Sequence, residues 1–208
     1  MDSFLDITVI INSFEYNYVK DSLKKKCFEY VKENEEKILI SFFVQEGLKR
    51  AILKRKEIYN LVLKKIKDTS YEIVFEKAVL LNKKDILFAN NLYSNIKKEE
   101  FSSLKNKFDN EINFLNFSTS YFLEKLNSKF FIKEENLDSS LISLIHSFIA
   151  DHEDCKVLAS AIQIQKDKKM FFFVTADQHF IPGSYDALKE DSRLEGYKIP
   201  ELINLLYN

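Results

Sequence analysis

The chain has 208 residues, which suits one domain of generous size or a small domain carrying a large insertion. Apolar residues make up 46% and charged residues 30%, and the net charge of −1 excludes a strongly basic nucleic-acid-binding domain while leaving room for local basic clusters. No apolar run approaches the ~20 residues of a membrane helix, Asp2 and Asp6 interrupt any signal peptide, and Cys27 and Cys155 lack metal-site spacing, so we expect a cytoplasmic protein.

The first predicted element is a short strand that ends at Asp6. Residues 3–11 could also form one buried strand, because apolar residues flank Asp6 on both sides. A carboxylate without a partner in the middle of a buried strand would be costly. We therefore favour a strand that stops at Asp6, a helical turn from Val9 to Phe14, and an amphipathic helix over residues 17–34.

A second buried strand is predicted at Lys37–Ser41, followed by a long helix over Phe42–Lys67. Ser41 suits the N-cap of this helix. Glu46 lies in its first turns, near the sheet edge where we expect Asp6.

Basic residues follow Glu46 along the same predicted helix, starting with Lys49 and Arg50 and ending at Lys67. One interpretation is a solvated helix face, which Glu57 interrupts. The alternative is a surface that contacts a nucleic-acid backbone, with an affinity that depends on salt.

The middle of the chain shows helical spacing without a recognisable repeat or linker. The predicted helices are Tyr71–Leu81, Asp85–Ile96, Phe101–Phe114, Thr119–Phe130 and Leu137–Phe148. We interpret residues 70–136 as a helical insertion in a single domain over residues 1–208.

The stretch from Asp151 to Phe180 is predicted to form half of an α/β unit. A helix with acids in its first turn is followed by a polar break at Lys166–Lys169 and an apolar strand at Met170–Val174, typical of a buried parallel strand. Asp177 follows that strand. In open α/β sheets, ligands bind beyond the carboxyl ends of the strands.

After Phe180 we expect a turn at residues 181–184 and a partly helical segment at 185–195. Gly196–Ile199 is predicted to be a short edge strand. Pro200 is then predicted to start a helix over Glu201–Tyr207.

Acidic residues therefore recur where strands end and helices begin. They are Asp6, Glu46, Asp151, Asp154 and Asp177. Carboxylates that converge at one edge repel one another and raise one another's pKa values. A divalent cation relieves that repulsion, and Mg²⁺ and Mn²⁺ prefer oxygen ligands, so these acids form a candidate metal site. His152 and His179 flank the acids and are interpreted first as polar surface.

Several segments together carry a resemblance to the PIN domain family. They are Phe4-Leu5-Asp6-Ile7-Thr8-Val9, Ile40-Ser41 with Glu46, Asp154 with Ala159 and Ala161, Thr175-Ala176-Asp177-Gln178-His179-Phe180, and Ile199-Pro200-Glu201-Leu202. The family pattern has a first Asp after a short strand, an acid in the helix after the second strand, and a Thr-x-Asp-x-x-Phe signature. Thr8 stands where the family usually has Asn.

The resemblance implies a three-layer α/β/α fold with a small central parallel sheet and an enlarged helical insertion. It also implies a metal-dependent endoribonuclease that uses Mg²⁺ or Mn²⁺, as a toxin or as an RNA-processing or defence nuclease. The acids it assigns to catalysis and metal binding are Asp6, Glu46, Asp154 and Asp177, with Asp151 as an auxiliary metal ligand. The residues we assign to substrate binding are Thr8, Ser41, Thr175, Lys49 and Arg50.

Two alternatives stay open. One is a degenerate PIN-like module that binds RNA or a protein. The other, ranked lower, is a phosphatase of the haloacid dehalogenase-like class, which would need a second Asp where this chain has Thr8. Partners left open are RNA or single-stranded DNA, an antitoxin or another protein, and a second copy of the chain as a homodimer.

Overall fold

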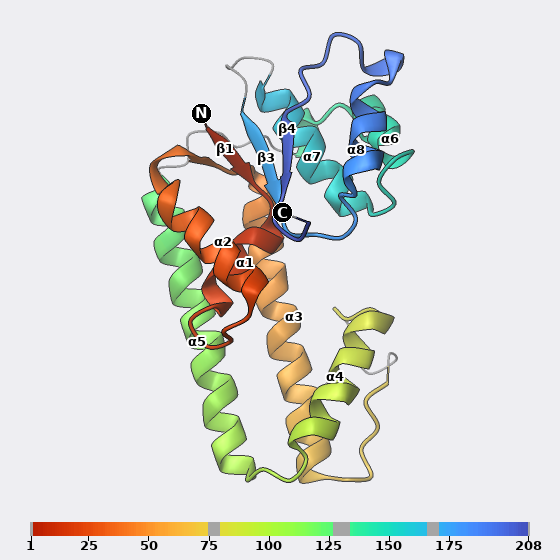
Figure 1. Cartoon of the computed structure of the whole chain (residues 1–208). Helices are drawn as coiled ribbons and strands as arrows, with labels where there is room; N and C mark the ends of the chain where they lie inside the picture. Colours follow the sequence, from red (N-terminus) through yellow and green to blue (C-terminus); the bar gives the residue numbers. More distant parts are fainter. Residues whose placement is uncertain (1, 75–79, 127–133, 166–170, 208) are drawn as a thin grey trace. The chain divides into compact units, whose positions relative to one another are not determined.

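A computed structural model describes residues 2–74, 80–126, 134–165 and 171–207 (Figure 1). The chain is a mixed α/β protein, mostly helical, with a small four-stranded sheet. It forms two compact units, each described here by itself. The first consists of residues 1–48 and 122–208, and the second of residues 49–121. No helix within the described ranges is long and apolar enough to cross a membrane.

The sheet belongs to the first unit. Its strands are β1 (Ser3–Leu5), β2 (Ile38–Leu39), β3 (Phe172–Thr175) and β4 (Glu201–Asn204). The helices that lie in this unit or begin or end in it are α1 (Ile7–Glu15), α2 (Ser22–Glu33), α3 (Phe42–Lys67), α5 (Phe101–Lys125), α6 (Ser139–His146), α7 (His152–Gln165) and α8 (Pro182–Lys189). Short 3-10 turns occur at η1 (Glu35–Lys37), η3 (Glu134–Asn136) and η4 (Ser192–Leu194).

All strands are parallel, in the order β2-β1-β3-β4. Figure 1 shows β1, β3 and β4 running side by side in the same direction. The register pairs Leu5, the last residue of β1, with Val174, so β1 and β3 end within one residue of each other. The backbone N–H of Asp6 then donates to the carbonyl of Val174 at 2.9 Å. The residues after these two strands are therefore brought together at the carboxyl edge of the sheet.

Aromatic side chains form the core around the sheet. Phe4 of β1 packs on Phe171 and Phe173, with ring centroids 6.4 and 6.0 Å apart. Phe173 also contacts Phe180 and Tyr185, and all five side chains are almost completely buried. Burial on both faces of the strand explains why the apolar run is unbroken rather than alternating.

Several predictions about the first half of the chain are confirmed. The first strand stops before Asp6, and α1 begins at Ile7 with Asp6 as its N-cap. The long helix α3 spans Phe42–Lys67, directly after Ser41. The helix predicted over residues 17–34 begins later, at Ser22, because the Asp21 side chain accepts the backbone N–H of Lys24 and caps it there.

The C-terminal segment was predicted wrongly. Residues 201–204, predicted as the start of a helix, form strand β4, and Gly196–Ile199 forms no strand. The predicted turn at residues 181–184 contains the start of α8, with Pro182 in its first turn. Hydrogen bonding of β4 to the exposed edge of β3 outweighs local helix signals, because tertiary pairing decides the conformation of such short segments.

Two helix predictions in the middle also need correction. Residues 71–74 are irregular rather than helical, and residues 75–79 lie outside the described ranges. Phe101–Phe114 and the described part of Thr119–Phe130 belong to one helix, α5. Its buried positions recur every three or four residues without a break: Leu104, Phe108, Ile112, Leu115, Thr119 and Phe122. The predicted polar break at Lys166–Lys169 also lies outside the described residues.

The second unit begins within α3, earlier than the insertion predicted at residues 70–136. It contains most of α3, all of α4 (Lys83–Ile96) and most of α5. Tyr59 of α3 stacks on Phe108 of α5 with centroids 3.9 Å apart, and its hydroxyl donates to Glu111. A reciprocal capping box between Asn82 and Asp85 starts α4.

Candidate metal centre

Asp6 is the most buried acid of the site, with only 1% of its surface exposed. Its Oδ1 accepts the backbone N–H of Ile7 at 2.7 Å, so it caps α1. Its Oδ2 accepts the hydroxyls of Thr8 at 2.6 Å and Thr175 at 2.8 Å. The carboxylate is thus fixed at the end of β1 by three donors.

The two threonines also hold the loop after β3. Thr8 Oγ1 accepts the backbone N–H of Ala176 at 3.1 Å, and Thr175 Oγ1 accepts that of Asp177 at 3.0 Å. Each hydroxyl therefore donates to Asp6 and accepts from the segment that carries Asp177. This network couples the orientation of Asp6 to the position of Asp177.

Asp154 comes from the first turn of α7. The side chain of Asp151 caps this helix, because its Oδ1 accepts the backbone N–H groups of Glu153 at 2.9 Å and Asp154 at 3.3 Å. Asp154 Oδ2 lies 2.9 Å from Nδ1 of His179, and Asp177 Oδ1 lies 3.2 Å from the same nitrogen. His179 therefore joins two acids that belong to different elements.

Burial and mutual repulsion change the titration of these acids. Burial, with a further contribution from the charge of Asp177, raises the pKa of Asp6 above its usual value despite its three donors. Burial first, and then the charges of Asp6 and Asp177, raise the pKa of Asp154 to about 7. The structure therefore concentrates negative charge where water solvates it poorly.

The pKa of His179 is also raised, which in a histidine favours the charged form. Burial lowers the pKa of its imidazole, but the hydrogen bond to Asp154 and the charge of Asp177 outweigh that effect and raise the pKa overall. The backbone N–H of His179 also donates to Asp177 Oδ1 at 2.7 Å, which fixes the turn after β3.

Glu46 directly precedes a close contact between α3 and the start of α1. The neighbouring residue, Gly47, approaches Ile7 so closely that a Cβ at Gly47 would lie 2.2 Å from Ile7 Cδ1. The helical turn that carries Glu46 therefore packs against the residue after Asp6. Glu46 is half-buried, and its part in metal binding stays a prediction.

The residues predicted to bind substrate lie in different settings. Ser41 and Thr175 are completely buried, and Ser41 accepts the backbone N–H of Val44 at 3.4 Å near the start of α3. Thr8 belongs to the Asp6 network. Lys49 and Arg50 occupy exposed positions of α3 in the second unit.

Asn204 supports the site from β4, a role that our sequence analysis did not predict. Its amide donates to the carbonyls of Asp177 at 2.8 Å and Phe180 at 2.9 Å, so it holds both ends of the loop that carries His179. Asn204 was missed because its segment was predicted to be a helix. Gly47 was also missed, although a glycine inside a predicted helix costs stability relative to alanine and can mark a packing constraint.

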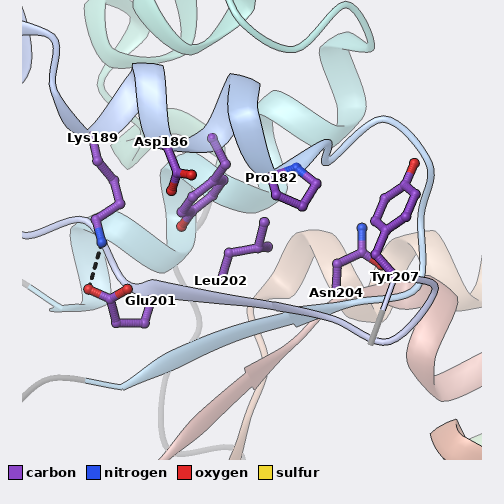
Figure 2. Close-up of a pocket in the computed structure, with 8 residues that line it drawn as sticks. Pro182, Asp186, Lys189, Glu201, Leu202, Asn204 and Tyr207 are labelled. Carbon is purple, nitrogen blue, oxygen red and sulfur yellow. Dashed lines mark hydrogen bonds and ion pairs between the residues drawn. The ribbon is translucent and has the colours of Figure 1, made fainter.

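A small hollow lies between α8 and β4 (Figure 2). Its volume is about 170 Å³, and Lys189 pairs with Glu201 across it at 2.6 Å. Asn204 lines this hollow, but Asp6, Asp154 and Asp177 do not. The acid cluster thus does not line the hollow, although Asn204 both lines it and donates to the backbone carbonyl of Asp177.

The donor set of the cluster fits a divalent cation. Asp6, Asp154 and Asp177 present carboxylate oxygens, the ligands that Mg²⁺ and Mn²⁺ prefer. Burial first, and then the charges of neighbouring acids, raise the pKa values of Asp6 and Asp154, and a bound cation would favour their charged forms. Among the described residues, donor atoms of Asp151, Asp154 and His179 lie within 4.8 Å of one another.

Comparison with known proteins gives no further assignment. No protein-family model matches the chain, and neither a curated protein nor a solved structure matches it.

Proposed function

We propose that this protein is a metal-dependent endoribonuclease of the PIN type, which uses Mg²⁺ or Mn²⁺ to hydrolyse RNA phosphodiester bonds. The observation that supports this function is the convergence of Asp6, Asp154 and Asp177 at the carboxyl edge of a parallel sheet. The three acids come from opposite ends of the chain. Gathering three carboxylates costs stability through their repulsion, and a bound cation would use them as ligands and relieve that cost. The three-layer arrangement of the PIN family is part of the same proposal.

Each residue has a distinct task in this reaction. Asp6, Asp154 and Asp177 would hold the cation, with Glu46 and Asp151 as further ligands. When bound, the cation supplies positive charge for the scissile phosphate and lowers the pKa of a water molecule.

The protein's own groups complete the chemistry. Thr8 and Thr175 orient Asp6 through their hydroxyls. Asp154 has a pKa of about 7 in the metal-free protein and shares a hydrogen bond with His179, so this pair can hold a proton at neutral pH. RNA is the proposed substrate, and an antitoxin or other protein partner stays a prediction.

Asp177→Asn tests this function. The asparagine can still accept the backbone N–H of His179, so the variant should fold, but it removes a charged ligand. We expect cleavage to fall by more than about 100-fold, the upper range for residues that only orient metal ligands. The measurement is cleavage of mixed RNA and single-stranded DNA with and without Mn²⁺. Asp186→Asn, at an exposed position of α8, is the matched control.

Three outcomes would contradict the proposal in different ways. Unchanged cleavage in Asp177→Asn would remove the catalytic assignment. RNA binding by the wild-type protein without metal-dependent cleavage would favour the degenerate module. Hydrolysis of a phosphate monoester without RNA cleavage would favour the phosphatase.

A further inference from the structure

His179 occupies the position where the acids of the site converge. Its Nδ1 lies 2.9 Å from Asp154 Oδ2 and 3.2 Å from Asp177 Oδ1. The imidazole is only partly exposed, at 32%, and its backbone is fixed by the N–H bond to Asp177. The ring nitrogen therefore faces two proposed ligands from a fixed main chain.

These distances match the spacing of atoms that share one ion. Donors about 2.1 Å from a cation and about 90° apart lie about 3 Å from each other. We propose that His179 is itself a ligand, binding the cation through Nδ1 together with Asp154. The donor atoms of these two residues and of Asp151 lie within 4.8 Å of one another. The inference rests on the metal site of the proposed function and adds a nitrogen to its all-oxygen donor set.

A nitrogen ligand changes which metal the site prefers. Imidazole suits transition metals, whereas Mg²⁺ is bound by oxygen ligands and water. The site should therefore favour Mn²⁺ over Mg²⁺ more strongly than an all-carboxylate site would.

A different arrangement would give the same distances in the metal-free protein. The ring could simply hydrogen-bond to the two carboxylates as a counter-charge, and it would then compete with the cation. The two arrangements predict opposite results when the ring is removed. Removing a competing ring would raise the affinity for the metal, whereas removing a ligand would lower it.

Electron paramagnetic resonance of bound Mn²⁺ distinguishes them, because a coordinated imidazole produces a nitrogen coupling. The chain has three histidines, so the signal can be assigned with few variants. We would compare the wild-type protein, His179→Asn and the matched control His152→Asn. Labelling the wild-type protein with ¹⁵N-histidine tests for coordination by histidine even if His179→Asn does not fold.

We expect a nitrogen coupling in the wild-type protein and in His152→Asn, and its loss in His179→Asn. Mn²⁺ affinity should fall by about tenfold or more in His179→Asn, because losing even a residue that only orients metal ligands has an effect of about this size. Mg²⁺ affinity, measured by competition against Mn²⁺, should change less.

The possible failures are distinguishable. Bound Mn²⁺ without nitrogen coupling, or tighter Mn²⁺ binding in His179→Asn, overturns the ligand assignment and leaves the metal site standing. Absence of Mn²⁺ binding at millimolar concentration overturns both. Nitrogen-coupled Mn²⁺ in a protein that cleaves no RNA supports the ligand and overturns the nuclease.

Discussion

Thr8 shows how one residue can organise a site without carrying charge. Its hydroxyl donates to Asp6 and accepts from the backbone of Ala176, so it connects β1 to the loop after β3. The buried Asp6 carboxylate needs such donors, because burial raises its pKa and disfavours its charged form. Thr8 thus connects the buried carboxylate of Asp6 to the loop that carries Asp177.

Thr8→Val should remove both contacts while keeping the shape of the side chain. We expect a loss of about 1–3 kcal/mol of unfolding free energy, because the backbone N–H of Ala176 and an oxygen of Asp6 each lose a partner. Mn²⁺ affinity should fall as well. The measurements are urea unfolding and a Mn²⁺ titration.

Thr8→Ser is the matched control, because it retains the hydroxyl and should keep most of the affinity. If Thr8→Val binds Mn²⁺ as the wild-type protein does, the hydroxyl network does not position Asp6.

At the scale of elements, Gly47 explains why α3 can pack against the start of α1. A Cβ at this position would lie 2.2 Å from Ile7 Cδ1 and 2.9 Å from Ile7 Cγ1. A glycine inside a helix costs about 1 kcal/mol relative to alanine. The close approach of the two helices, with Glu46 next to the contact, accounts for that cost.

Gly47→Ala should therefore destabilise the protein although alanine favours helix. We expect a net loss of about 1–3 kcal/mol, the range for overpacking a filled interior. A double-mutant cycle with Ile7→Ala tests the cause, because removing the Ile7 side chain makes room for the new methyl group.

The cycle is measured by urea unfolding of the two single variants and the double variant. In the Ile7→Ala background, Gly47→Ala should be neutral or stabilising. An equal loss in both backgrounds would show that the contact with Ile7 is not the reason for glycine.

For the whole molecule, we expect the acid cluster to make stability depend on pH and, if the proposed cation binds, on metal as well. The folded protein holds a proton on Asp154 up to a pKa of about 7, whereas the unfolded chain releases it near the ordinary value of 3.8. Between these values the folded state binds more protons, so unfolding free energy decreases as pH rises. Each unit of difference between the folded and unfolded pKa values corresponds to about 1.4 kcal/mol of unfolding free energy. The loss of unfolding free energy caused by Asp154 is absent below the pKa of the unfolded chain and complete above the folded pKa of about 7.

Asp154→Asn should therefore be more stable than the wild-type protein at pH 8 without metal. The difference should shrink toward pH 4, because the wild-type carboxyl is then protonated in both states. Unfolding by urea at both pH values checks this. A difference that does not depend on pH would contradict the raised pKa of Asp154.

At pH 8, Mn²⁺ should make the wild-type protein more stable than Asp154→Asn. A cation at 100 times its dissociation constant stabilises the folded state by about 2.7 kcal/mol. The wild-type protein should gain this stability, and Asp154→Asn should gain much less. Equal stabilisation of both proteins would place the Mn²⁺ site elsewhere.

Local patterns in the sequence were sufficient for much of the fold. The unbroken apolar run before Thr175 predicted a buried parallel strand, and helical spacing predicted α3 from Phe42 to Lys67. The cost of burying a carboxylate within a strand predicted that β1 would stop at Asp6. Each inference used neighbours along the chain, so no knowledge of distant residues was needed.

Tertiary structure alone decided the rest. Residues 201–204 form β4 because the edge of β3 supplies hydrogen-bond partners that no local pattern reveals. The contact of His179 with Asp154 depends on how the β3 loop meets α7, and the bond from Asn204 to that loop depends on β4. The candidate acids could be identified from the sequence. The raised pKa values of Asp6 and Asp154 arise only in the folded protein, where burial removes water and brings the carboxylates near one another.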